Sequence, residues 1–319
     1  IAPINGAQAL RRPFIRNVIN FRPSYHDEMA TLAEFFVGTK GFKKVSLIYQ
    51  NDRYGLDCKV GLELALKARG ITTVPSASYE RNTLVVDPAL QILKSAGKPD
   101  VFIVAAVAPP SLVFVQLARA EFGDVPFGFN SGCGVEALQV LLNSANQSLS
   151  NIFLTQVVPP FTSAAIGIVK EFQAEVDQSE RTAASLEGFI IGKFVSELVR
   201  LTVADGHAIS RQALIDKVYS TQSFGLNGLT VGPFSDSCLR DGGKSQCCNQ
   251  GSNRVYLSRF SVESDLEVVP DFEYVLPQCG IDYSSVFLSL SLSLSFSLSN
   301  SNTQQQQQQQ LFHQIQIEF

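Results

Sequence analysis

The stretch KKVSLIYQNDRYGLD, residues 43–57, decides the fold of this chain. A mostly apolar run from Val45 to Tyr49 ends in a polar turn, and Gly55 opens a segment with helical spacing. A strand that stops at such a turn and leads into a helix is the unit of an α/β protein, and α/β proteins bind ligands at these turns. The stretch therefore predicts an α/β fold with a candidate binding turn.

The same alternation of apolar strands and helical patterns continues to Pro160. Strands this apolar are buried on both faces, so the sequence predicts a parallel, doubly wound sheet covered by helices. The predicted strands are 45–49, 71–79, 100–106, 125–130 and 151–158, and the predicted helices are 55–69, 87–96, 111–123 and 134–145.

The segments on either side of this lobe are expected to form a second lobe together, with the chain crossing near Lys43 and Pro160. They contain a predicted strand at 17–22, helices at 27–38, 163–177, 183–204 and 210–219, and an antiparallel pair at 254–260 and 266–275. The predicted domains are 1–43, a remnant of the N-terminal lobe; 44–160, the inserted second lobe; 161–280, the return to the first lobe; and 281–319, a tail.

The tail is of low complexity, with alternating Leu and Ser over 288–302 and consecutive Gln over 304–310. Alternation of this kind also fits an amphipathic edge strand. A repeat-derived, disordered tail is the preferred interpretation.

Composition excludes several classes of protein. The 319 residues are 45% hydrophobic and carry a net charge of −4, with no basic cluster, so a nucleic-acid partner is not expected. No apolar run reaches the roughly 18 residues of a transmembrane helix. The first residue, Ile1, indicates a processed or truncated N-terminus.

Cysteine usage favours an oxidising compartment. Four of the six cysteines crowd into a Gly- and Ser-rich stretch, and the disulfide candidates are Cys238, Cys247, Cys248 and Cys279. Free thiols are the alternative. Zinc is disfavoured because no C-x-x-C pair occurs, so no metal is expected. The sequon at Asn146 is a glycosylation candidate that fits secretion.

The turn after Tyr49 does not suit a phosphate. QNDRYG has a single glycine, and Asp52 would repel an anion, so no nucleotide cofactor is expected. Asp52 and Tyr54 suit a small polar or zwitterionic ligand instead. The alternative is a plain turn in which Asp52 bonds to the backbone.

No catalytic constellation is recognisable. The histidines His26, His207 and His313 are scattered, G-x-S-x-G does not occur, and Asp27-Glu28 sit at a helix start, where carboxylates offset the macrodipole. Small or polar residues at three other strand ends, Ala106, Ser131 and Gln156, converge on one cleft, and Ser131 lies at a helix N-terminus that suits a carboxylate. The residues thus predict a hinged, non-catalytic binding module.

Several segments resemble the periplasmic-binding-protein type I family, in its branched-chain amino-acid receptor branch. The segments are PINGAQALRRPF (3–14), NFRPSYHDEMATLAEFF (20–36), KVSLIYQNDRYGLDCKVGLELAL (44–66), YERNT (79–83), PDVFIVAA (99–106), FLTQVVPP (153–160) and ASLEGFIIGKFVSELVR (184–200). The resemblance implies a two-lobed fold whose first lobe is incomplete at the N-terminus, hence a fragment.

Within the family, LTVGPFSDSC (229–238) and CCNQGSNRVYLSRF (247–260) are most similar to the extracellular domain of trypanosomatid receptor-type adenylate cyclases. That resemblance implies a truncated ectodomain involved in cAMP signalling, on the extracellular face of the plasma or flagellar membrane. The full-length form would be membrane-anchored and dimeric, with its catalytic domain outside this chain. The alternative is an amino-acid-binding protein of an ABC-type importer.

The family's ligand-binding positions map onto this sequence by resemblance. The first-lobe loop corresponds to Asn5 and Ala7, the hinge to Ser24 and Tyr25, and the second-lobe turns to Tyr54, Ser131 and Gln156. The implied ligand is a small polar molecule, such as an amino acid or a related metabolite.

Overall fold

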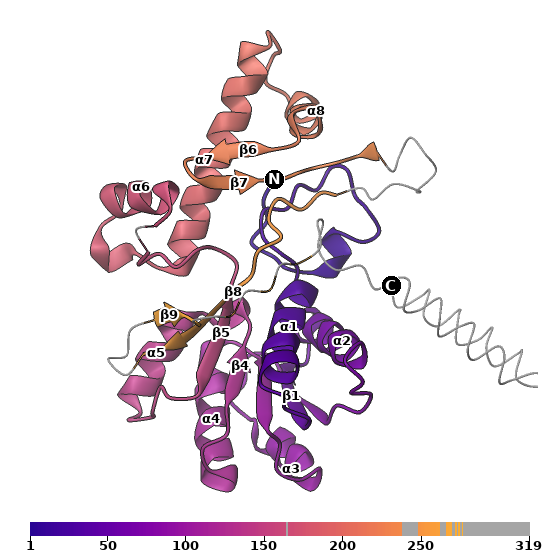
Figure 1. The fold of residues 1–319 in the computed structure, drawn as a ribbon, viewed down its shortest axis with the longest axis vertical. Coiled ribbons are helices and arrows are strands. Elements are labelled where there is room, and N and C mark those ends of the chain that lie inside the picture. The colour runs from indigo at the N-terminus through magenta and orange to yellow at the C-terminus, as the bar shows by residue number, and fades with distance from the viewer. Residues whose placement is uncertain are drawn as a thin grey trace, which may run out of the picture. The chain divides into compact units, whose positions relative to one another are not determined.

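A seven-stranded sheet in the order β2-β1-β3-β4-β5-β8-β9 organises the fold (Figure 1). In this computed structural model the first five strands run parallel, while β8 and β9 run antiparallel. The strands are β1 (Val45–Gln50), β2 (Ser76–Tyr79), β3 (Val101–Ala105), β4 (Phe127–Phe129), β5 (Ile152–Gln156), β8 (Tyr256–Phe260) and β9 (Leu266–Val268). The α/β class is confirmed, but the sheet is mixed rather than all parallel, because β8 pairs with the edge of β5 that would otherwise be exposed.

Helices cover both faces of this sheet. One face carries α1 (Tyr25–Ala33), its π-helical extension η2 (Glu34–Thr39) and α2 (Arg53–Lys67); the other carries α3 (Asp87–Ser95), α4 (Ala108–Phe122) and α5 (Val135–Ser144). Strand β3 shows why both faces must be covered. Val101 and Ile103 lie in the apolar cluster on the α1 side, and Phe102 and Val104 lie in the cluster on the α4 side.

A third apolar cluster lies around the helices α6 (Gly167–Glu175), α7 (Ala183–Ala204) and α8 (Arg211–Thr221) and the hairpin of β6 (Phe224–Leu226) and β7 (Leu229–Val231). The predicted helices at 183–204 and 210–219 are confirmed. The hairpin was not predicted, although Asn227-Gly228 between two apolar triplets is a recognised hairpin signal, and both residues have positive φ.

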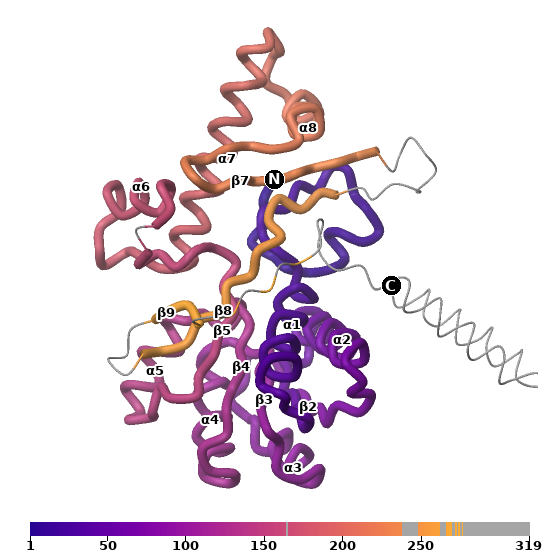
Figure 2. The backbone as a smooth tube through the Cα atoms, viewed as in Figure 1, coloured from indigo at the N-terminus to yellow at the C-terminus, as the bar shows by residue number. Residues whose placement is uncertain are grey.

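The segment before α1 runs beside the segment before β8, as Figure 2 shows in indigo and orange. The predicted strand at 17–22 is wrong: residue Asn20 makes an isolated bridge to Gln250. The buried Arg11 guanidinium ties these segments together, since Nε donates to Gln250 Oε1 at 2.7 Å and Nη2 donates to the Arg22 carbonyl at 2.7 Å. Burial lowers the pKa of Arg11 to about 10, against the nearby charge of Asp27.

Two segments outside the predicted inserted lobe pack with its sheet. Residues of α1 and η2 share an apolar cluster with β1, and β8 and β9 extend the sheet itself. The predicted antiparallel pairing of residues near 256–268 is confirmed. The division into lobes stays a prediction.

The structure describes residues 1–163, 165–237, 248–261, 266–269, 272, 274 and 276. The chain divides into two units, Ile1–Ile281 and Asp282–Phe319, and every described residue lies in the first. The predicted tail therefore lies outside the described residues. Within the described ranges, no helix is both long and apolar enough to cross a membrane.

The contact between α1 and α2 gives a test of this packing. A Cβ placed on Gly61 of α2 would lie 2.8 Å from the His26 backbone, whereas one on Gly188 of α7 would have nothing within 4 Å. We expect Gly61→Ala to destabilise the protein by about 1–3 kcal/mol by overpacking. The matched Gly188→Ala should stabilise it by about 0.5–1 kcal/mol, as alanine does within a helix. Urea unfolding measures both; a shift of the same sign in both variants would contradict the close approach.

Candidate ligand-binding site

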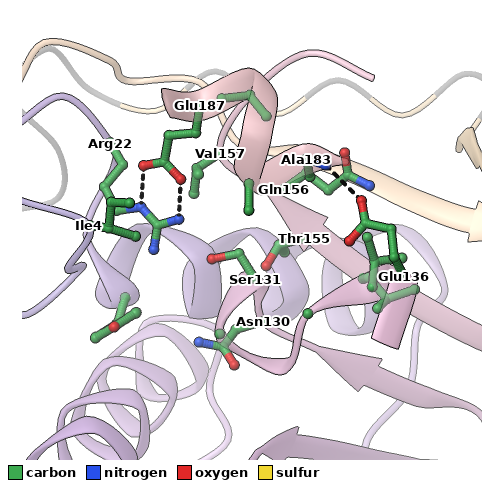
Figure 3. A pocket seen from close by; sticks show the side chains of 17 residues that line it. Ile4, Arg22, Asn130, Ser131, Glu136, Thr155, Gln156, Val157, Ala183 and Glu187 are labelled. Atoms are coloured by element: carbon green, nitrogen blue, oxygen red, sulfur yellow. Dashed lines mark hydrogen bonds and ion pairs between the residues drawn. The ribbon is translucent and has the colours of Figure 1, made fainter. Parts of the chain in front are cut away.

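A cavity of about 270 Å³ lies at the carboxyl ends of β4 and β5, beside the first turn of α7 (Figure 3). Its walls come from the turn after β4 (130–132 and 134–136), the end and extension of β5 (154–158) and α7. Ile4, Arg22 and Tyr25 complete the lining. Ligands of α/β proteins bind at this edge of the sheet.

A buried carboxylate, Glu28 of α1, organises the floor of the cavity from behind. Its Oε2 accepts from the Ser131 backbone N–H at 2.7 Å and from Thr155 Oγ1 at 2.5 Å, and its Oε1 accepts from Ser131 Oγ at 2.9 Å. Burial raises the pKa of Glu28 above its ordinary value, although the Arg22 charge and the bonds from Thr155 and Ser131 oppose this shift. Glu28 thereby joins α1 to the ends of β4 and β5.

An ion pair between two buried side chains forms one wall. Arg22 Nε donates to Glu187 Oε1 at 2.9 Å, and Arg22 Nη2 donates to Glu187 Oε2 at 2.7 Å (Figure 3). Burial lowers the pKa of Arg22, but the charge and hydrogen bonds of Glu187 outweigh it, so the pKa is raised. This bidentate pair fixes the guanidinium beside the cavity.

Two tyrosines and an asparagine support the turn after β4. The Tyr54 hydroxyl donates to Asn130 Oδ1 at 2.6 Å, and the Tyr54 ring meets the Tyr25 ring edge-on with centroids 5.1 Å apart. Burial raises the pKa of Tyr25 to about 12 and holds the pKa of Tyr54 well above its ordinary value. Both phenols are therefore neutral hydrogen-bonding groups.

Gln156 stands out among the polar residues of the cavity. It is 2% exposed, and neither of its amide atoms has a hydrogen-bond partner among the described residues. A buried amide without a partner lowers the stability of the folded state by roughly 1–3 kcal/mol. A polar group that enters the cavity could supply the missing hydrogen bonds.

Glu136 connects the sheet layer to α7. Its Oε1 accepts a hydrogen bond of 2.6 Å from the backbone N–H of Ala183, the first residue of α7 (Figure 3). A carboxylate at a helix N-terminus also interacts favourably with the helix dipole. The contact closes one side of the cavity.

The structure brings together three of the residues predicted from the sequence. Tyr25, Ser131 and Gln156 all line the cavity. Tyr54 lies directly behind this lining, through its contacts with Tyr25 and Asn130.

The other predicted residues lie apart from the lining. Ser24 caps α1 by accepting from Asp27 N, and Asp52 caps α2 by accepting from Gly55 N at 3.1 Å, which is the plain-turn role considered for Asp52. Asn5 accepts from the Ala7 N–H at 2.8 Å in a local turn, and Ala106 is buried after β3.

Of the disulfide candidates, Cys238, Cys247 and Cys279 lie outside the described residues, so the pairing stays a prediction. Cys248 is buried, and its backbone bonds to Ser235. Asn146 is exposed in the loop after α5 and stays a glycosylation candidate. The described part of the chain contains no cluster of His, Cys, Asp and Glu that could hold a metal ion.

Comparison with known proteins agrees with this geometry. The periplasmic binding protein family model matches residues 6–259. The chain belongs to the periplasmic binding protein family. A crystal structure of a possible leucine/isoleucine/valine-binding protein from Rhodopirellula baltica is 25% identical, with a TM-score of 0.68 over 84% of this chain and 70% of that chain. The leucine-binding protein of Thermotoga maritima shares the fold at 12% identity, with a TM-score of 0.64 over 83% of this chain and 70% of that chain.

A curated relative, the Leu/Ile/Val-binding protein homolog 7 of Brucella abortus, is 27% identical over 177 residues. The match covers 54% of this periplasmic binding protein chain and 44% of the relative, so the chain spans less than half of that protein's length. The periplasmic-binding-protein type I family predicted by resemblance is confirmed. The trypanosomatid cyclase ectodomain finds no support in these relatives.

Sequence reasoning missed four residues at the site: Arg22, Glu28, Glu136 and Glu187. The sequence predicts that Glu28 caps the helix together with Asp27. Asp27 does cap α1, whereas Glu28 points to the sheet. Glu187 could have been noticed in the sequence because it is a charged residue directly beside the apolar positions Leu186 and Ile190, which α7 buries.

The Arg22–Glu187 pair gives a second test. Arg22→Met leaves the Glu187 carboxylate buried without its partner, and we expect a loss of about 3–5 kcal/mol in the free energy of unfolding. The double variant Arg22→Met/Glu187→Leu should recover most of this loss, because neither charge is then stranded. Arg200→Met breaks an exposed pair with Glu197 and serves as the control, which should change little. Equal losses in the single and double variants would contradict the pairing.

Proposed function

We propose that this chain binds a small amino acid of the branched-chain type in the cavity and acts as a solute receptor. The observation that carries the proposal is the buried Gln156 amide, which lines the cavity without a hydrogen-bond partner among the described residues. Relatives that are named as leucine-, isoleucine- and valine-binding proteins support the ligand class.

The lining suits such a ligand in size and chemistry. A volume of about 270 Å³ is near the lower end of small-molecule sites, which run to roughly 1,000 Å³. Apolar side chains, among them Val135, Val157 and Val158, provide contact for an aliphatic side chain. Arg22, Ser131 and Gln156 provide polar groups for the charged end.

The proposed partner is the membrane component of an ABC-type importer, which would receive the ligand outside the cell membrane. A second candidate is the cyclase-linked receptor suggested by residues 229–260. The solute receptor has the better support, because a relative is a binding protein with a Leu/Ile/Val-binding name.

Ligand binding is tested directly by thermal shift and calorimetry with the chain and L-leucine, L-isoleucine and L-valine. A ligand at a hundred times its Kd stabilises the folded state by about 2.7 kcal/mol, so a saturable rise in Tm is expected. D-glucose, which has no charged end, serves as the control and should leave Tm unchanged. If none of the three amino acids raises Tm or gives a heat of binding, the proposal fails.

Gln156→Met separates binding from folding. The substitution removes, at nearly constant volume, a buried amide that has no partner among the residues that the structure describes, so we expect the ligand-free protein to be as stable as the parent or more stable. Affinity for L-leucine should fall about tenfold or more, since the ligand loses a hydrogen bond to a buried group. Chemical unfolding and calorimetry measure the two effects. A destabilised variant with unchanged affinity would show that Gln156 has an internal structural role instead.

A further inference from the structure

Two hydroxyl groups lie side by side on the floor of the cavity, on Ser131 and Thr155 (Figure 3). Both are bonded to the same buried carboxylate, Ser131 Oγ to Glu28 Oε1 at 2.9 Å and Thr155 Oγ1 to Glu28 Oε2 at 2.5 Å. The other acceptor near Thr155 Oγ1, the Phe129 carbonyl at 3.4 Å, also lies within the protein.

The hydrogen bonds to Glu28 determine whether this floor donates or accepts hydrogen bonds. The Glu28 oxygens accept the hydrogen bonds from both hydroxyls, and a hydroxyl has a single proton to donate. Because both hydroxyl protons are directed at Glu28, Ser131 and Thr155 can present only lone pairs to the cavity. The floor is therefore made of hydrogen-bond acceptors.

The backbone N–H of Ser131 is also already hydrogen-bonded to Glu28. The Ser131 N–H, which begins the short helix η3 (Ser131–Cys133), donates to Glu28 Oε2 at 2.7 Å. The carboxylate bound at this helix N-terminus thus belongs to the protein itself, and its place cannot also be taken by a carboxylate of the ligand.

The charges around the cavity favour the same kind of ligand group. Arg22, Glu136 and Glu187 line it, and Glu28 lies behind the floor. Two nitrogens of Arg22 are already bonded to Glu187. One guanidinium therefore faces three carboxylates, and a positively charged donor relieves this imbalance whereas an anion increases it.

We propose that the Ser131–Thr155 floor recognises a ligand ammonium group, and that Glu28 is the positioning residue that makes the floor selective for it. This inference deepens the proposed function and rests on it for the location of the site. A keto or carboxylate oxygen of a ligand is itself a hydrogen-bond acceptor, so it would face the acceptor oxygens of Ser131 and Thr155 without a proton to share.

Calorimetry with three related probes tests the inference. L-leucine and L-leucine amide carry the ammonium group, and 4-methyl-2-oxopentanoate has a keto oxygen in its place. We expect both ammonium probes to bind and the keto acid to bind about a hundredfold more weakly or not at all, since a site built for a hydrogen-bonding group rejects an analogue without it.

Glu28→Gln is the matching variant, because it keeps the shape and removes the charge. Its amide can donate to one of the hydroxyls and so turn that hydroxyl's proton toward the cavity. Affinity for the ammonium probes should fall about tenfold or more, and the preference over the keto acid should shrink. Glu63→Gln, the same change at an exposed carboxylate of α2, should alter neither.

Thr155→Val provides a second route should Glu28→Gln not fold. It removes one acceptor oxygen at constant shape, and we expect it to weaken the ammonium probes without strengthening the keto acid. If the keto acid binds the parent chain as tightly as L-leucine, the inference is overturned while the proposed function stands. If L-leucine amide binds and L-leucine does not, the proposed function fails while the inference stands. If no probe binds, both fail.

Discussion

The burial of one carboxylate, Glu28, constrains the whole site. Taking an ionised carboxylate out of water is unfavourable unless its oxygens are hydrogen-bonded, and here three donors from Ser131 and Thr155 satisfy them. Those donors sit at the ends of two neighbouring strands, so the helix α1 and the carboxyl edge of the sheet must stay in register. The shape of the cavity floor follows from that requirement.

Buried polar contacts surround this floor on the other sides. The Arg22–Glu187 pair holds one wall, and the Glu136 carboxylate caps α7 on another. Such contacts contribute little net stability, since the desolvation of charges offsets most of their attraction. The Gln156 amide, which has no hydrogen-bond partner among the described residues, is a cost that the proposed ligand would offset.

The sequence predicted the parallel strands and the covering helices well, because apolar runs and helical periodicity are local signals. Strand β8 could be predicted as a strand, but its pairing with β5 could not, because about a hundred residues separate the two. Glu28 was missed for a geometric reason. It follows Asp27 by one residue, and successive helical residues point about 100° apart, so one caps the helix while the other reaches the sheet.

The central claim is that the ligand occupies the cavity above Glu28. Its most direct test is ¹H–¹⁵N NMR of the Ser131 amide during titration with L-leucine, because this N–H is bonded to the Glu28 carboxylate beneath the cavity. The account predicts a saturable shift of the Ser131 resonance at a stoichiometry of one ligand per chain. Saturation of the protein with ligand while the Ser131 resonance stays unchanged would place the binding site elsewhere and contradict the account.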